Sequence, residues 1–257
     1  MENRIKELFK SKKGNLLSVY YTAGFPKLND TLPIAVGLER AGVDIIEIGI
    51  PFSDPIADGP TIQESNKIAL DNGMNLHLLL EQVRGIRKCV SLPIILMGYL
   101  NPVLQFGFEK FVKEAAKVGV DGLILPDLPL DEYLLGYKKI VDEIGLTNTF
   151  LISPTTSEER IRKIDAASNG FIYAVSSSST TGVQQGFSTE QESYFKRLQD
   201  MELVNPFLIG FGVSNHETFA AVSKYSLGAI VGSAFISLLK SSTDLESDIT
   251  RFIKGLR

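Results

Sequence analysis

The chain has 257 residues, of which 44% are hydrophobic and 22% are charged, and its formal net charge is -4. This length and apolar content suffice for one large core, whereas a pI near 5.4, without any basic stripe, argues against a nucleic-acid partner. Cys89 is the single cysteine and His77 and His216 are the two histidines, so an internal disulfide is excluded and no thiolate or histidine metal site is expected.

The amino-terminal segment is charged and is not followed by an apolar stretch of signal-peptide type. No apolar run anywhere in the sequence approaches the length of a membrane span. We therefore expect a cytoplasmic protein with no membrane contact. Within this first segment, Ile5, Leu8 and Phe9 stand at helical spacing and predict a short amphipathic helix.

Beyond that helix the chain alternates between short apolar runs and amphipathic stretches. The apolar runs predict eight strands, over residues 16–21, 43–50, 92–97, 121–125, 147–152, 170–175, 207–210 and 229–231. Helical spacing predicts helices over residues 30–40, 62–70, 76–90, 108–118, 131–144, 157–167, 189–201, 215–225 and 245–256, and a further helix from Ser233. A polar tract over residues 176–188 separates the sixth strand from its helix.

Strands that alternate with helices about every thirty residues are typical of the (β/α)₈ barrel, which has about 250 residues. We predict a single TIM-barrel domain over residues 1–257, with an extra helix at the amino terminus and an extra short helix at the phosphate-binding end. The competing architecture is an open doubly wound sheet. Against it, no Gly-x-Gly-x-x-Gly opens a helix after the first strand. The tripeptide Gly-Val-Asp at residues 42–44 recurs at residues 119–121, as expected of repeated strand–helix units.

The second strand carries the most informative residue, because Glu47 interrupts an apolar run. A buried carboxyl is costly unless it is paired or used. The loop that follows, rich in proline and glycine, adds Asp54 and Asp58. Each acid alone is more simply interpreted as an ion-pair partner or a turn former. Together they have the layout of a site at the carboxyl ends of parallel strands, where Glu47, Asp58, Tyr99, Asp127 and Tyr173 would all lie.

Glycines late in the chain supply a second half of this site. They follow the sixth, seventh and eighth strands, at residues 181–182, 210–214 and 231–234. Many barrels bind phosphate in these loops, and backbone N–H groups at a helix start can hold an anion without lysine or arginine. One such glycine is more often a turn, but three successive loops predict phosphate contacts from Gly182, Gly212, Gly232 and the Ser233 hydroxyl.

With these residues in view, the sequence resembles the tryptophan synthase alpha subunit family along essentially its whole length. The resemblance rests on residues 47–63, Glu-Ile-Gly-Ile-Pro-Phe-Ser-Asp-Pro-Ile-Ala-Asp-Gly-Pro-Thr-Ile-Gln. Supporting matches lie at residues 97–102, 126–129, 170–173, 210–214 and 232–234.

The resemblance implies a lyase of tryptophan biosynthesis that splits indole-3-glycerol phosphate into indole and glyceraldehyde 3-phosphate by a retro-aldol reaction. It implies that Glu47 is the proton donor and acceptor and that Asp58 orients the indole N–H. The residues implied to line the substrate pocket are Tyr20, Leu100, Tyr173, Thr181 and Phe211.

The resemblance also has implications for cofactors and for the partner of this chain. No metal or organic cofactor is expected in the chain itself. The implied partner is a pyridoxal-phosphate beta subunit in an alpha2beta2 assembly, docked near Pro55 and a turn at residues 101–102, which would receive indole directly.

One loop departs from the family pattern. Ser177 and Ser179 stand where the family usually has arginine and glycine, which puts in question how this loop closes and how closure is coupled to the beta subunit. Two alternatives stay open: another sugar-phosphate enzyme on the same barrel, such as an isomerase or a decarboxylating cyclase, or a non-catalytic activating subunit. The retained Glu47 and Asp58 argue against the second.

Overall fold

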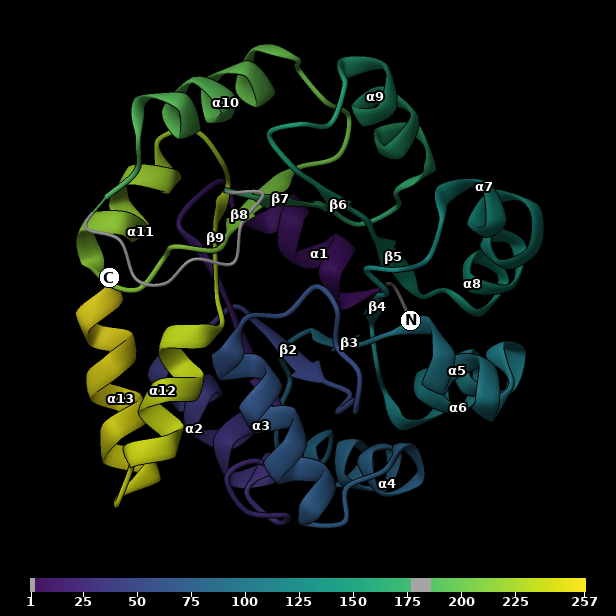
Figure 1. Ribbon diagram of the computed structural model, residues 1–257, viewed down its shortest axis with the longest axis vertical. Coiled ribbons are helices and arrows are strands. Elements are labelled where there is room, and N and C mark those ends of the chain that lie inside the picture. Colours follow the sequence, from purple (N-terminus) through teal and green to yellow (C-terminus); the bar gives the residue numbers. More distant parts are fainter. Residues whose placement is uncertain (1–2, 177–185) are drawn as a thin grey trace.

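The computed structural model describes residues 3–176 and 186–257. In this part of the chain, nine parallel strands follow the order β5-β4-β3-β2-β1-β9-β8-β7-β6, with helices around the outside (Figure 1). The strands are β1 (Leu16–Thr22), β2 (Ile45–Gly49), β3 (Ile94–Met97), β4 (Gly122–Ile124), β5 (Thr147–Thr149), β6 (Leu151–Ile152), β7 (Ile172–Val175), β8 (Phe207–Gly210) and β9 (Gly228–Val231).

The two strands at the ends of this order, β5 and β6, are halves of one extended stretch. Only Phe150 separates them, and the single strand predicted over residues 147–152 is therefore wrong in this detail. β5 pairs with β4 and β6 pairs with β7, while the Phe150 carbonyl accepts a hydrogen bond from the Tyr173 N–H at 2.9 Å. The sheet thus returns upon itself as a nearly closed barrel, and the predicted fold class is confirmed.

The helices pack outside the barrel in chain order. They are α1 (Arg4–Ser11), α2 (Thr31–Ala41), α3 (Pro60–Asp71), α4 (Leu76–Ile86), α5 (Leu100–Phe106), α6 (Phe108–Val118), α7 (Leu130–Glu132), the π-helix η1 (Tyr133–Tyr137), α8 (Lys138–Ile144), α9 (Glu158–Ala167), α10 (Thr189–Asp200), α11 (His216–Ser223), α12 (Ser233–Ser241) and α13 (Leu245–Leu256). The last strand, β9, is followed by two helices, α12 and α13, instead of one. The extra helix predicted after the last strand is therefore present. None of the helices in the described ranges is long and apolar enough to cross a bilayer.

Three other predicted elements differ from the structure. The turn predicted at residues 101–102 is wrong, because these residues belong to the first turn of α5. The helix predicted over residues 131–144 has a π-helical middle, η1, between α7 and α8. The helix predicted over residues 76–90 ends at Ile86, and Arg87 is its C-cap.

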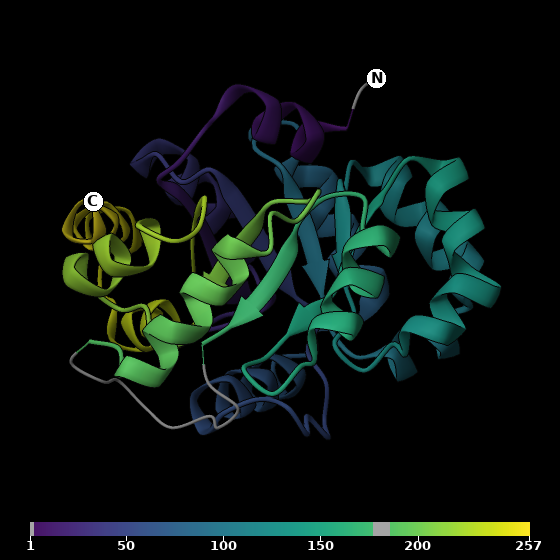
Figure 2. The same ribbon diagram turned by 90° about the horizontal axis from the view of Figure 1, so that it is seen from above.

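The predicted amino-terminal helix is present as α1, and it covers one end of the barrel. Figure 2 shows it at the end opposite the arrowheads of the strands. Ile5 of α1 is fully buried in the apolar cluster that fills the barrel interior, and the Phe9 ring lies 5.7 Å from that of Phe171. The other buried members of the cluster come from the strands and from Phe171, so α1 closes the interior at the end where the strands begin.

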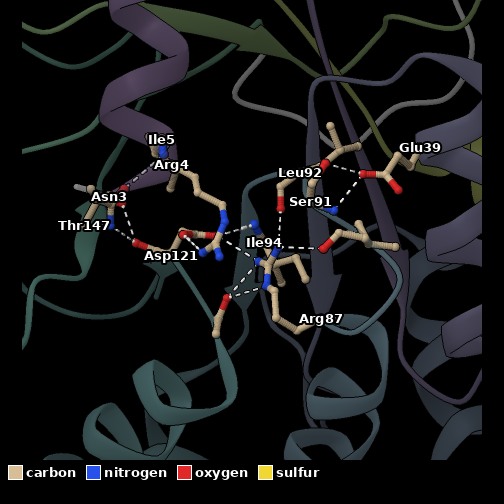
Figure 3. A network of polar contacts seen from close by, with 12 residues as sticks. Asn3, Arg4, Ile5, Glu39, Arg87, Ser91, Leu92, Ile94, Asp121 and Thr147 are labelled. Carbon is tan, nitrogen blue, oxygen red and sulfur yellow. Dashed lines mark hydrogen bonds and ion pairs between the residues drawn. The ribbon is translucent and has the colours of Figure 1, made fainter. Parts of the chain in front are cut away.

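Buried aspartates connect the elements at this end of the barrel, and Figure 3 shows the contacts of Asp121. The Asp121 carboxylate accepts hydrogen bonds from Ile94 N–H, Arg87 and Arg4, all at 2.9 Å. Asp44 repeats the pattern, because it accepts from Leu17 N–H at 2.9 Å and pairs with basic residues near both ends of the chain. The recurring Gly-Val-Asp therefore has a structural cause: each aspartate holds the first N–H groups of a neighbouring strand.

Candidate active site

Glu47 occupies the centre of β2 with its side chain fully buried. In the sheet register it stands beside Tyr20 of β1 and Ile95 of β3. Ser18 Oγ donates a hydrogen bond of 2.6 Å to Glu47 Oε1, whereas Oε2 has no hydrogen-bond partner among the described residues. Burial raises the pKa of Glu47 to about 7, against the opposing effect of the Ser18 hydrogen bond. A carboxyl with this pKa can donate and accept a proton near neutral pH.

Two tyrosines flank this carboxyl and lie over glycines at the strand ends. A Cβ atom on Gly49 would overlap the Tyr20 hydroxyl, and one on Gly210 would overlap the Tyr173 hydroxyl. The glycines therefore give the phenol rings the room to approach the sheet backbone. Burial, followed by the charges of Glu47 and Asp58, raises the pKa of both phenols, so both remain protonated hydrogen-bond donors.

Asp58 lies in the loop between β2 and α3, and Tyr99 fixes its position. The Tyr99 hydroxyl donates to Asp58 Oδ2 at 3.1 Å and accepts from the Ala57 N–H at 3.0 Å. Burial raises the pKa of Asp58, and the Tyr99 hydrogen bond lowers it. The charges of Asp58 and Glu47 both raise the pKa of Tyr20 and of Tyr173.

Phe211 and Gly212 form a sharp turn directly after β8. Both residues have positive φ, 67° and 76°, which glycine accepts but which is unusual for phenylalanine. The Ser176 hydroxyl donates to the Phe211 carbonyl at 2.8 Å and so holds this conformation. As a result the Phe211 ring lies 6.2 Å from the Tyr173 ring, nearly edge-on at 71°.

The amino terminus of α12 is the candidate anion site. Gly232 is its N-cap and provides no side-chain hydrogen bond, so the first-turn N–H groups have no cap of that kind. Ser233 is the first helical residue and is exposed. A Cβ atom on Gly232 would lie 3.7 Å from Tyr20 Cβ, which places this helix start beside the tyrosine that neighbours Glu47.

The remaining predicted site residues have different outcomes. Thr181 and Gly182 lie outside the described residues, as do Ser177 and Ser179. Leu100 begins α5, donates its N–H to Asp127 Oδ1 at 2.8 Å and packs against the core between barrel and helices. Its contact with an indole ring therefore stays a prediction, as do the chemical roles of the other site residues.

Sequence reasoning missed two contacts of this site. Ser18 carries a sequence signal, since its hydroxyl interrupts the apolar first strand two positions before Tyr20. Tyr99 was expected at the strand ends but without a function, and its bond to Asp58 depends on the path of the intervening loop. The residues that the structure describes contain no cluster of three or more histidine, cysteine or acidic side chains able to hold a metal ion.

Comparison with known proteins supplies an independent result. The family model described as "Tryptophan synthase alpha chain" matches residues 6–255. A tryptophan synthase alpha chain of Parabacteroides distasonis is 53% identical over 255 residues, covering 99% of each chain. The crystal structure of the alpha chain from Legionella pneumophila superposes with a TM-score of 0.89 at 33% identity, covering 100% of this chain and 96% of that one. A chain of the tryptophan synthase complex from Pyrococcus furiosus gives 0.86 at 34% identity, covering 95% and 98%.

Proposed function

Because this chain belongs to the tryptophan synthase alpha chain family, we propose that it performs the alpha reaction with Glu47 as acid and base and Asp58 as the group that orients the indole. The chain is a lyase of tryptophan biosynthesis, and the alpha reaction cleaves indole-3-glycerol phosphate. The observation that carries the assignment of roles is the fully buried Glu47, whose pKa burial raises to about 7.

The proposed reaction balances without a cofactor in this chain. Protonated Glu47 gives its proton to indole C3, and the positive charge spreads to the indole nitrogen. Asp58, accepting a hydrogen bond from the indole N–H, stabilises that charge. The Glu47 carboxylate then takes the proton of the hydroxyl on the carbon attached to C3, the bond between that carbon and C3 breaks, and its electrons restore the aromatic ring. Indole and glyceraldehyde 3-phosphate leave, and Glu47 is protonated again.

The phosphate of the substrate is proposed to sit at the start of α12. The N–H groups after Gly232, the Ser233 hydroxyl and the helix dipole supply the attraction, with Gly212 and Gly182 on neighbouring loops. Tyr20, adjacent to Gly232, joins this subsite to the indole pocket, which Tyr173, Phe211, Leu100 and Thr181 complete.

Gly232→Val is expected to weaken binding of glycerol 3-phosphate about tenfold or more, equivalent to about 1.4 kcal/mol. The added side chain would stand in front of the first-turn N–H groups, and the nearest protein atom, Tyr20 Cβ, is at an ordinary contact distance of 3.7 Å from the new Cβ. The inhibition constant of glycerol 3-phosphate against cleavage provides the measurement. Gly14→Val, before β1 at the opposite end of the barrel, is the control. An unchanged inhibition constant in Gly232→Val would place the phosphate elsewhere.

We further propose a pyridoxal-phosphate beta subunit as partner, an alpha2beta2 assembly, a cytoplasmic location and one domain over residues 1–257. The relative from Pyrococcus furiosus comes from a tryptophan synthase complex, which supports the partner. The proposed docking face surrounds Pro55 and residues 101–102. Exposed apolar side chains on the same two segments support it: Ile56 is 88% exposed and Leu104 is 45% exposed.

Adding the beta subunit is expected to raise the rate of cleavage by one to two orders of magnitude. Closure of the loops at the strand ends completes such sites, and a partner needs only about 1.4 to 2.8 kcal/mol of preference for the closed form to produce this rise. With Ser177 and Ser179 in the sixth loop, the activation is expected to fall toward the lower figure. Release of indole from indole-3-glycerol phosphate is followed while beta subunit is titrated into a fixed amount of this chain. Full activity of the chain alone, with no complex, would instead describe a free-standing lyase.

A further inference from the structure

We propose that Ser18 is a positioning residue for the cleavage: its hydroxyl holds Glu47 by Oε1 and so leaves Oε2 as the oxygen that exchanges the proton with the substrate. The inference rests on the proposed role of Glu47 as acid and base. It assigns a function to a residue on a different strand, which contacts the catalytic group rather than the substrate.

The geometry comes from the register of the first two strands. Ser18 and Tyr20 are two residues apart in β1, so their side chains lie on the same face, and Tyr20 pairs with Glu47 across the β1–β2 ladder. Ser18 is fully buried, and its Oγ lies 2.6 Å from Glu47 Oε1. This distance is typical of a hydroxyl that donates to an ionised carboxylate.

The two oxygens of Glu47 are therefore not equivalent. Oε1 already accepts the Ser18 hydroxyl, whereas Oε2 is buried without a hydrogen-bond partner in the described part of the chain. A buried polar atom without a partner is unfavourable, and such an atom in a native structure calls for an explanation. A substrate that brings C3 and its neighbouring hydroxyl to Oε2 supplies that explanation. In the protonated acid the hydrogen belongs on Oε2, because Ser18 points its own hydrogen at Oε1.

The groups around Glu47 leave Ser18 as the main opponent of the rise in its pKa. The titratable groups that interact with it are the Tyr20 phenol from β1 and the Tyr173 phenol from β7. From the strand-end loops, Asp58 acts on both phenols and Tyr99 acts on Tyr20. The neighbour on β3 is the apolar Ile95. Burial keeps both phenols neutral, so neither places a charge beside Glu47. Within the described residues, Ser18 is the group that donates a hydrogen bond to Glu47 and opposes the effect of burial.

The test compares Ser18→Ala with Ser18→Thr in the complex with the beta subunit. The alanine variant is expected to shift the Glu47 inflection in the pH profile of kcat/KM about one pH unit upward and to lower kcat about tenfold, with KM changed less than twofold. Threonine keeps the hydroxyl and is expected to restore both values. The substrate phosphate titrates equally in all variants, so the difference between profiles isolates Glu47. Carboxyl-¹³C NMR of labelled glutamate, assigned with Glu47→Gln, gives the same pKa without turnover.

Ser65→Ala is the matched control. Ser65 in α3 is also a buried serine, and its Oγ donates to the Ile62 carbonyl at 2.8 Å and lies 2.7 Å from Thr22 Oγ1 rather than bonding to Glu47. A Ser18→Ala protein with the wild-type inflection and kcat would overturn the inference, as would a shift equally present in Ser65→Ala or a change in melting temperature alone. If Glu47→Gln is inactive while Ser18→Ala is normal, only this inference fails. If Glu47→Gln is fully active, the proposed function fails with it.

Discussion

Replacing Glu47 by glutamine is expected to reduce cleavage of indole-3-glycerol phosphate by about 10² to 10⁴, or roughly 3 to 5 kcal/mol of transition-state stabilisation. The glutamine side chain has the same size, and its carbonyl oxygen can still accept the Ser18 hydrogen bond. It cannot give a proton to indole C3 and then take one from the substrate hydroxyl. Indole release at saturating substrate, with the beta subunit present, measures the loss. A rate within threefold of wild type would exclude Glu47 as the acid and base.

The pH dependence of stability tests whether the Glu47→Gln variant is folded. Although the variant is expected to lose activity, it is expected to become more stable relative to wild type as the pH rises. The pKa of Glu47 rises from 4.5 to about 7 on folding. Below pH 4.5 the residue is protonated in both states and has no effect on stability. As the pH rises from 4.5 to 7, the unfolded chain ionises first, so the wild type loses stability, and above pH 7 the loss is complete at about 3 kcal/mol.

Glutamine does not ionise, so the Glu47→Gln protein does not lose stability in this way. Its free energy of unfolding, relative to wild type, is expected to improve by about 2 kcal/mol between pH 5 and pH 9 in urea titrations. A constant difference between the two proteins across this range would mean that Glu47 does not titrate with a raised pKa. A variant that is inactive and yet gains stability with pH cannot owe its inactivity to misfolding.

Asp58→Asn is expected to lower the rate of cleavage about 10²-fold or more, with binding of glycerol 3-phosphate unchanged. The substitution removes the negative charge that is proposed to face the developing indole cation, and losses of 10² to 10³ are typical when one such stabilising group is removed. The start of α12, which is proposed to bind the phosphate, is untouched. Steady-state cleavage and inhibition by glycerol 3-phosphate separate the two effects.

Tyr99→Phe is the matched control for this experiment. It keeps the charge of Asp58 but removes the 3.1 Å hydrogen bond to it and the bond to Ala57. We expect a smaller loss of activity than in Asp58→Asn, since the carboxylate remains but is less well held. Activity of Asp58→Asn close to wild type would remove Asp58 from the mechanism.

The barrel could be predicted because its signals are local and repeat along the chain. Apolar runs and helical spacing recur often enough that an error in one element does not alter the architecture. The helix α5 was missed because Pro102 was interpreted as part of a turn, although proline is tolerated in the first turn of a helix. The N-cap of α5 is Tyr99, which provides no side-chain cap, so the usual sequence signal for a helix start was absent.

The site was predictable only in part. Glu47 stands out as one acid in an apolar strand, and Asp58 follows it in a loop whose sequence is distinctive. The bond from Ser18 depends on the pairing of two strands, and Gly49 and Gly210 are explained only by the tyrosine rings that lie over them. Such contacts form between segments that are distant in the sequence, so they cannot be predicted from residue spacing along the chain.

The position of α1 has a consequence for the route of the product. Ile5 and the apolar side chains of the barrel interior fill the end of the barrel that α1 covers, so the proposed site around Glu47 would be closed on that side. Indole released at the proposed site would therefore leave at the strand ends, on the side from which the substrate enters. A partner seated over the strand ends would meet every molecule of indole before the bulk solvent does. Because α1 closes one end of the barrel, transfer of an apolar intermediate to a second enzyme would take place at the other end.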